Sequence, residues 1–203
     1  KGVINGKYVD TLAFGAYKRE VFEKIGGYDE ELVRNQDDEF NFRLIQNGGK
    51  IWLDPSIKSF YYPRKSLSKL FKQYFQYGFY KIRVVQKRRG FSSWRQIIPS
   101  IFVISLLIFF FYAIAFSVIL PFYLLILIYS SVNLIAVLFE IVKMVLKNKP
   151  RNKPQFSFVI FVVLPLVYFI LHFSYGLGSV LGLIYFWDKW NDIGLKDNKY
   201  KRS

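Results

Sequence analysis

Three consecutive acidic residues, Asp37, Asp38 and Glu39, form the densest group of side chains that could perform acid–base chemistry. A carboxylate that faces a cleft can accept the proton of an attacking hydroxyl group, and it then acts as a general base. The alternative is structural, because carboxylates in the first turn of a helix stabilise its N-terminal dipole by about 0.3–1 kcal/mol. The residues by themselves leave both interpretations open.

The residue types that the sequence lacks exclude several other chemistries. It contains no cysteine, so a thiolate nucleophile, a disulfide and a cysteine metal site are excluded. Its one histidine, His172, lies in an apolar stretch. A histidine-rich metal site is therefore excluded, and a Ser-His-Asp triad would depend on that single ring.

Residues 1–62 are predicted to form an α/β head that carries the acidic cluster. About 60 residues make a marginal domain, and the chain begins at Lys1 without a methionine, so we expect it to be the C-terminal part of a larger protein. The expected elements are a strand at 9–14, a helix at 18–25 ended by Gly26-Gly27, a helix at 36–46 ended by Gly48-Gly49, and a short strand at 51–53 stopped by Asp54-Pro55.

The net charge of +15 is concentrated directly after the head. Residues 1–62 hold nine basic and ten acidic side chains, whereas residues 63–96 hold ten basic and no acidic ones. From Ser66 to Arg83 aromatic residues alternate with lysines, which is typical of an amphipathic helix at the headgroup region of a membrane. We therefore predict a basic interfacial helix within 63–95 whose partner is anionic lipid rather than nucleic acid, since a membrane span follows.

Two long uncharged runs predict a membrane region at 96–187. The run from Gln96 to Phe139 has 44 residues, and as a helix it would measure about 66 Å, roughly twice a ~30 Å hydrocarbon core. Two spans at about 97–117 and 120–140 fit it, with the turn near Ser117 to Pro121. The second run, Pro154 to Trp187, predicts one span at about 156–175.

The remainder of the second run, 177–187, is either a fourth crossing, a re-entrant piece or an interfacial helix. Its Gly178-to-Gly182 spacing permits close contact between helices, although glycines also occur in membrane helices by chance. A polar tail follows at 188–203. The basic segment before the first span and the lysine-rich loop after the second predict a cytoplasmic head on a protein integral to the plasma membrane.

Three segments of the head resemble glycosyltransferase family 2, and among its members the succinoglycan-type exopolysaccharide glucosyltransferases. The segments run from Val9 to Phe22, from Ile25 to Glu30 and from Asn35 to Leu44, and the resemblance extends to about residue 95. It implies that the head is the C-terminal, acceptor-side part of a GT-A-like α/β domain, followed by an α-helical transmembrane region of three or four spans.

The resemblance also assigns roles to individual residues. In that family an acidic pair opens the helix that holds the general base, which implies Asp37 as the base and Asp38 as the alternative. Gln73-Tyr74-Phe75-Gln76-Tyr77 stands where the family carries Gln-x-x-Arg-Trp; the alternative is a helix that only lies on the membrane. The further substrate-binding candidates are Asp10, Gly15, Ala16, Glu39, Gln73, Gln76, Tyr77 and Arg64. Arg64 is either a clamp for the leaving diphosphate or a solvated charge at the surface.

The activity implied by the resemblance is transfer of a hexose from a nucleotide sugar to a lipid-linked or other glycan acceptor, with inversion, in exopolysaccharide synthesis. It implies a divalent metal, Mg²⁺ or Mn²⁺, bound mostly by an N-terminal half-domain through Asp-x-Asp. This chain has no Asp-x-Asp, so we expect no metal site in it and no activity from it alone. The alternative function is a non-catalytic scaffold or transporter subunit, although the uncharged runs offer only His172 to an ion pathway.

Overall fold

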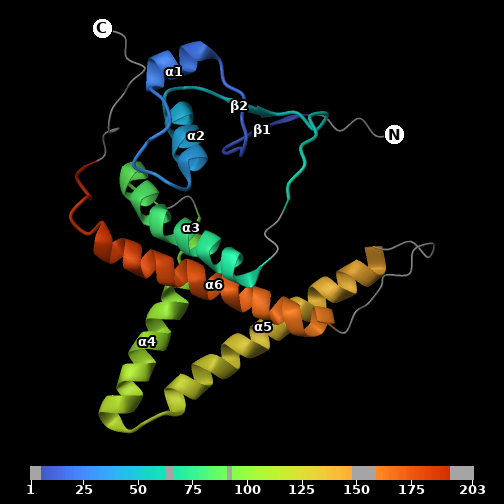
Figure 1. The fold of residues 1–203 in the computed structure, drawn as a ribbon, viewed down its shortest axis with the longest axis vertical. Helices are drawn as coiled ribbons and strands as arrows, with labels where there is room; N and C mark the ends of the chain where they lie inside the picture. Colours follow the sequence, from blue (N-terminus) through green and yellow to red (C-terminus); the bar gives the residue numbers. More distant parts are fainter. Residues whose placement is uncertain (1–5, 63–65, 91–92, 148–158, 193–203) are drawn as a thin grey trace.

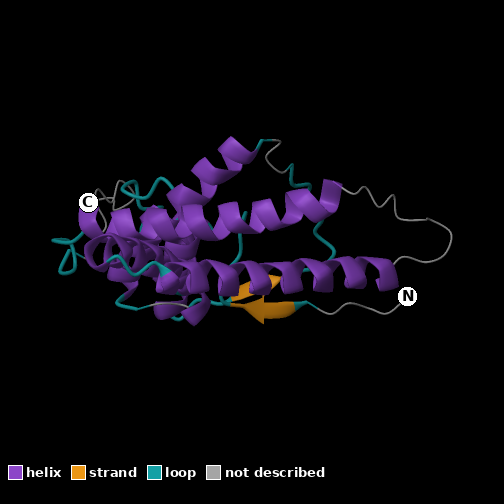
Figure 2. Cartoon of the chain, turned by 90° about the horizontal axis from the view of Figure 1, so that it is seen from below, coloured by secondary structure: helices purple, strands orange, loops and turns teal. Residues whose placement is uncertain are grey.

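The computed structural model describes residues 6–62, 66–90, 93–147 and 159–192, which form a small α/β head followed by long helices (Figure 1). This arrangement confirms the predicted fold class, a partial α/β domain joined to apolar membrane helices. Viewed from below, helices make up most of the molecule and the strands lie at one edge (Figure 2). The elements are β1 (Lys7–Val9), α1 (Arg19–Ile25), α2 (Gln36–Gln46), β2 (Ile51–Leu53), α3 (Leu67–Arg88), the 3₁₀ turn η1 (Trp94–Gln96), α4 (Ile98–Phe116), α5 (Leu120–Lys147) and α6 (Val159–Tyr185).

The head is built around the apolar face of α2. Phe40 is fully buried there, and Leu44, one helical turn further on, is buried against Ile25 at the end of α1 and Ile51 in β2. The strands β1 and β2 pair antiparallel, with Val9 opposite Ile51. This small core fixes α2, and with it the acidic first turn of that helix.

The predicted strand at 9–14 is wrong beyond Val9. β1 ends at Val9, and the chain then turns back as a loop in which Phe14 has a left-handed backbone conformation, with φ 61°. The amide of Asn41 on α2 donates to the carbonyl of Leu12 at 2.9 Å, so a side chain of α2 takes the place of a strand partner. The apolar residues Val9 and Leu12 of this segment therefore pack on the core of the head, although the strand does not continue.

α3 and α6 lie side by side and run in the same direction (Figure 1). Gly178 of α6 lies against the backbone of Phe75, and Gly182 lies against the backbone of Phe79 one turn further on. Gly78 of α3 in turn lies against the backbone of Tyr175. The close helix contact that the glycine spacing permits is thus present, and its partner is the basic helix α3.

α4 and α5 form a hairpin that projects away from the head (Figure 1). Its turn is at Ser117, which is left-handed with φ 54°, and α5 begins at Leu120, as the sequence predicted. Among the described residues three helices, those at 94–116, 120–146 and 159–185, are long and apolar enough to cross a membrane.

α6 is one continuous helix that runs from Val159, within the span expected at about 156–175, through the glycines to Tyr185. Glycine lowers helix stability by exposing the backbone to solvent and by its entropy. Here Gly176 lies against Pro99 of α4 and Gly178 lies against α3, so the backbone is covered by neighbouring helices. These contacts explain why the helix continues through its glycines.

Replacing Gly178 by valine should separate α3 from α6. A Cβ atom at this position would collide with the carbonyl of Phe75, and overfilled contacts of this kind cost about 1–3 kcal/mol. We expect a clear loss of thermal stability in detergent, measured by unfolding of the purified protein. Gly90→Ala is the matched control, since nothing lies within 4 Å of a Cβ there. Equal melting temperatures for the two variants would contradict the close contact.

Candidate active site

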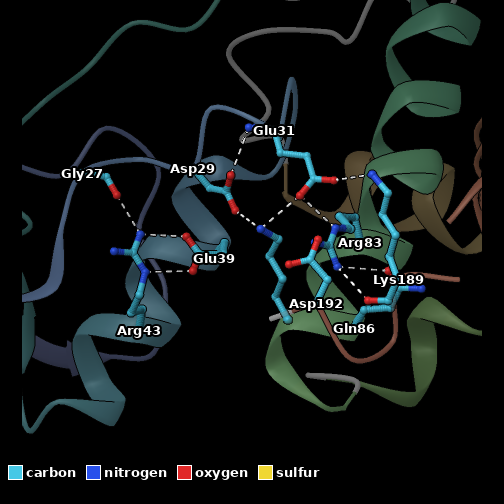
Figure 3. A network of polar contacts seen from close by, with 10 residues as sticks. Gly27, Asp29, Glu31, Glu39, Arg43, Arg83, Gln86, Lys189 and Asp192 are labelled. Atoms are coloured by element: carbon cyan, nitrogen blue, oxygen red, sulfur yellow. Dashed lines mark hydrogen bonds and ion pairs between the residues drawn. The ribbon is translucent and has the colours of Figure 1, made fainter. Parts of the chain in front are cut away.

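The three carboxylates in the first turn of α2 have different partners, beginning with Glu39, which is buried inside the head. Its two carboxylate oxygens each accept a hydrogen bond from the Arg43 guanidinium, both at 2.9 Å. Arg43 also donates to the carbonyl of Ile25. A further hydrogen bond joins Arg43 to the carbonyl of Gly27 at 2.8 Å (Figure 3). Glu39 therefore ties α2 to the end of α1, and its predicted role in substrate binding stays a prediction.

Asp38 holds the head on the basic helix α3. One of its oxygens accepts hydrogen bonds from Lys81 at 2.7 Å and from Arg88 at 2.9 Å. The Arg88 guanidinium also stacks over the ring of Phe42, 4.3 Å from its centroid. Because two cations of α3 bind one of its oxygens, Asp38 has a structural role in the contact between α2 and α3.

Asp37 is the carboxylate that stays unpaired. It is half-buried, and no described residue forms a hydrogen bond or an ion pair with its side chain. Desolvation, followed by the charges of Tyr28 and Asp37, raises the pKa of Tyr17 to about 12. Desolvation and the charge of Asp37 also raise the pKa of Tyr28. Asp37 therefore lies close to two phenols that remain neutral at physiological pH.

Asn41 positions the loop that faces Asp37. It lies four residues after Asp37, on the same face of α2, and it is fully buried. Its amide accepts from the Tyr17 hydroxyl at 2.5 Å and donates to the Thr11 hydroxyl at 3.2 Å. The loop that carries the candidates Asp10, Gly15 and Ala16 is thereby held along the Asp37 side of α2, with Asp10 and Ala16 exposed.

Sequence reasoning missed Asn41 and Tyr17 as residues that shape this site. The four-residue spacing from Asp37 to Asn41 is the signal that could have identified Asn41. Nothing in the local sequence indicates the contact with Tyr17, which is 24 residues away along the chain.

Two of the three candidates on α3, Gln76 and Tyr77, contact the segment that leads into α2. The Asn35 side chain donates to the backbone carbonyl of Tyr77 at 3.0 Å, and Arg34 donates to the Gln76 side chain at 3.1 Å. Gln73 donates to the Tyr77 hydroxyl at 2.9 Å. The segment Gln73 to Tyr77, which stands where the family carries Gln-x-x-Arg-Trp, therefore lies at the N-terminus of the helix that carries Asp37. Arg64 lies outside the described residues.

A buried ion network fixes the head relative to the membrane helices (Figure 3). Arg83 of α3 is fully buried and donates to Glu31 of the head at 2.9 Å, to Asp192 at 3.0 Å and to the carbonyl of Lys189 at 3.1 Å. The Lys189 side chain completes the network at 2.9 Å from Glu31. Head, α3 and the segment after α6 are therefore joined by one set of charges.

Metal ligands are not clustered in the part of the chain that the structure describes. No group of three or more His, Asp or Glu side chains there could hold an ion. The residues present do not fit a metal centre by themselves, so a divalent ion would need ligands from outside these residues.

The head and the apolar helices together define a membrane-associated α/β protein in which α2, the helix that carries Asp37, packs on the basic helix α3. The chain is 40% identical over 80 residues to the succinoglycan biosynthesis protein ExoA of Rhizobium meliloti, which covers 39% of this chain and 24% of that protein. It is 29% identical over 180 residues to a dolichyl N-acetyl-alpha-D-glucosaminyl phosphate 3-beta-D-2,3-diacetamido-2,3-dideoxy-beta-D-glucuronosyltransferase of Methanococcus voltae. That match covers 88% of this chain and 49% of the archaeal enzyme.

These relatives confirm the resemblance to glycosyltransferases of polysaccharide synthesis that the motifs predicted. The chain spans about a quarter of one relative and about half of the other. No family model and no solved structure matches it.

The Glu31 network should make stability depend on acid pH. Burial raises the pKa of the Glu31 carboxyl, but hydrogen bonds from Lys189, Lys87 and Arg83 outweigh burial and lower it to about 2. A carboxyl whose pKa is lowered in the folded state stabilises that state above its unfolded pKa, about 4.3. We therefore expect stability to fall as the pH drops from about 4.3 to about 2.

The Glu31→Gln variant tests this assignment. Removing one partner of a buried ion pair costs about 3–5 kcal/mol, because the remaining charges stay buried. The variant should unfold at lower temperature near pH 7 and lose less further stability below pH 4.3 than the wild type. If the melting temperatures of the two proteins fell equally below pH 4.3, the assignment of the acid dependence to Glu31 would be contradicted.

Proposed function

We propose that this chain is the acceptor side and membrane anchor of a family 2 glycosyltransferase of the GT-A type. The enzyme would transfer a hexose from a nucleotide sugar to a lipid-linked glycan at the cytoplasmic face of the plasma membrane, in the synthesis of a cell-surface polysaccharide. The observation that carries this proposal is that Asp37 has no ion-pair partner among the described residues, whereas Asp38 and Glu39, which follow it, are both paired.

The acceptor class is supported by one relative and by the charge of α3. The name of the archaeal relative specifies a dolichyl phosphate-linked sugar as its acceptor and a glucuronosyl group as the group transferred. An acceptor of this kind is anchored in the bilayer, so an enzyme that uses it must hold its base near the membrane surface. In this chain α3 joins the helix of Asp37 to the apolar helices.

The chemical role of Asp37 follows from its surroundings. Its carboxylate accepts the proton of the acceptor hydroxyl as that oxygen attacks the anomeric carbon from the face opposite the leaving diphosphate. A new glycosidic C–O bond forms while the bond to the diphosphate breaks, so the configuration at the anomeric carbon inverts. Asp38 and Glu39 act as positioning residues, because their ion pairs fix the orientation of α2.

A divalent ion in such an enzyme would stabilise the charge of the departing diphosphate. The described residues do not supply its ligands, and we derive no step through it.

Asp37→Asn should lower sugar transfer about 100- to 10,000-fold, because a carboxamide cannot accept the proton. The measurement is incorporation from a panel of radiolabelled nucleotide sugars by the full-length protein in membranes. Glu20→Gln, an exposed acid on α1, is the control and should retain the wild-type rate. Asp38→Asn should instead lower the melting temperature, whereas Asp37→Asn should not. Wild-type turnover by Asp37→Asn would overturn the catalytic assignment.

A further inference from the structure

A cavity of about 420 Å³ lies where the head meets the membrane helices. Asn35, directly before α2, forms one wall, and Tyr77 and Lys81 of α3 form another. The start of α4 and the middle of α6 close it, with Arg95 and His172 among the lining residues. Four segments that are distant in the sequence therefore build one pocket beside the first turn of α2.

The polar side chains of this pocket favour an anion. None of the described residues that line the pocket is acidic. Lys81 contributes positive charge but is already bound to Asp38 at 2.7 Å. Arg95 is exposed, and no described acidic side chain pairs with it. Its guanidinium is thus a cation ready to donate two parallel hydrogen bonds to a phosphate.

The apolar surroundings favour a ligand with a long hydrocarbon chain. Arg95 lies in the 3₁₀ turn three residues before α4 begins at Ile98. Ile98 and Ile101 are exposed apolar residues of that helix, and Leu171 of α6 lines the pocket itself. A ligand whose phosphate reaches Arg95 can therefore place its chain along α4 and α6 within the lipid.

We propose that this pocket binds the phosphate of the lipid-linked acceptor, with the Arg95 guanidinium as its principal cation. The inference rests on the proposed function and extends it to a pocket that Asp37 does not line. Asn35 lines the pocket two residues before Asp37, and the lining residue Lys81 binds Asp38, so the bound phosphate lies next to the first turn of α2. Arg95 is then a substrate-binding residue and not a catalytic one.

Binding of a polyprenyl phosphate tests the pocket without any transfer reaction. The full-length protein in phosphatidylcholine nanodiscs would be titrated with undecaprenyl phosphate, with phosphatidylglycerol and with inorganic phosphate, and the bound lipid measured by native mass spectrometry. We expect Arg95→Gln to weaken undecaprenyl phosphate binding about ten-fold or more. Arg89→Gln, which removes an exposed cation at the end of α3 outside the pocket, should leave it unchanged.

The outcomes separate this proposal from the proposed function. The proposed pocket would be contradicted if Arg95→Gln and the wild type bound undecaprenyl phosphate equally. It would also be contradicted if the wild type bound phosphatidylglycerol and undecaprenyl phosphate with equal affinity. Binding to inorganic phosphate with the same affinity would contradict it as well, since the lipid chain would then contribute nothing. Asp37→Asn should bind undecaprenyl phosphate as the wild type does. The binding measurement therefore tests the pocket even if Asp37 is not the general base.

A second observation concerns the path of α6, whose C-terminal end is fixed to the head. The Gln86 side chain donates to the carbonyl of Phe186 at 2.6 Å, and Lys189 reaches Glu31 of the head at 2.9 Å. An ion pair between two segments requires that both lie on the same side of the bilayer. The chain after α6 therefore lies on the side of the head.

The N-terminal end of α6 belongs to the same side. α4 leaves the head and α5 returns, and the last turns of α5 carry Lys143 and Lys147. The sequence that follows adds Lys149, Arg151 and Lys153, and such clusters stay on the cytoplasmic side. A helix that starts and ends on one side cannot be a complete crossing.

We infer that the described chain crosses the membrane twice, through α4 and α5, and that the continuous helix α6 lies along the bilayer on the head side without crossing it. Its C-terminal half lies along the basic helix α3, while its N-terminal half exposes apolar side chains such as Val162 and Leu166 to lipid. α6 would then form part of the membrane surface on which the head rests.

Single cysteines placed at three positions test this path, because the sequence has none of its own. In intact cells a membrane-impermeant maleimide should label Ser117→Cys at the α4–α5 turn. Asn152→Cys in the following loop and Asp188→Cys after α6 should react only after permeabilisation. Labelling of Asn152→Cys in intact cells would overturn the inference, because α6 would then cross.

Discussion

The buried guanidinium of Arg83 joins three segments that are far apart in the sequence. It lies on α3 and donates to Glu31 of the head and to the chain after α6. A buried cation is costly unless its hydrogen bonds are satisfied, so these partners cannot separate without leaving a charge unpaired. The orientation of the head on the membrane helices follows from this requirement, and the remaining features of the candidate site depend on that orientation.

With the head held in place, the first turn of α2 presents three carboxylates to three environments. Successive helical residues point about 100° apart, so adjacent acids cannot share one set of partners. Glu39 turns into the head towards Arg43, and Asp38 turns to the cations of α3. Asp37 turns to the loop held by Asn41, which is the direction in which no described cation lies within ion-pair distance. The local geometry thus separates structural acids from a candidate base.

The contact between α3 and α6 connects this site to the bilayer. Glycines at 78, 178 and 182 let the two backbones approach, and the aromatic ring of Phe79 packs on Phe186 with centroids 5.1 Å apart. α6 thereby brings His172 and Leu171 next to the residues that precede α4. The result is a pocket that is lined by the Arg95 cation and by the apolar Leu171.

The sequence by itself determined the elements whose signals are local. The helix at 36–46 and the strand at 51–53 followed from glycines, charges and apolar residues within a few positions. The turn near Ser117 followed from the length of the uncharged run and from Pro121. The acidic cluster and its motifs also identified the class of relatives. The segment at 9–14 failed as a strand because its partner is Asn41, about 30 residues away. Only the tertiary structure decided which carboxylate stays unpaired, since the cations that bind Asp38 lie 43 and 50 residues further along the chain and reach it only when α3 folds against α2.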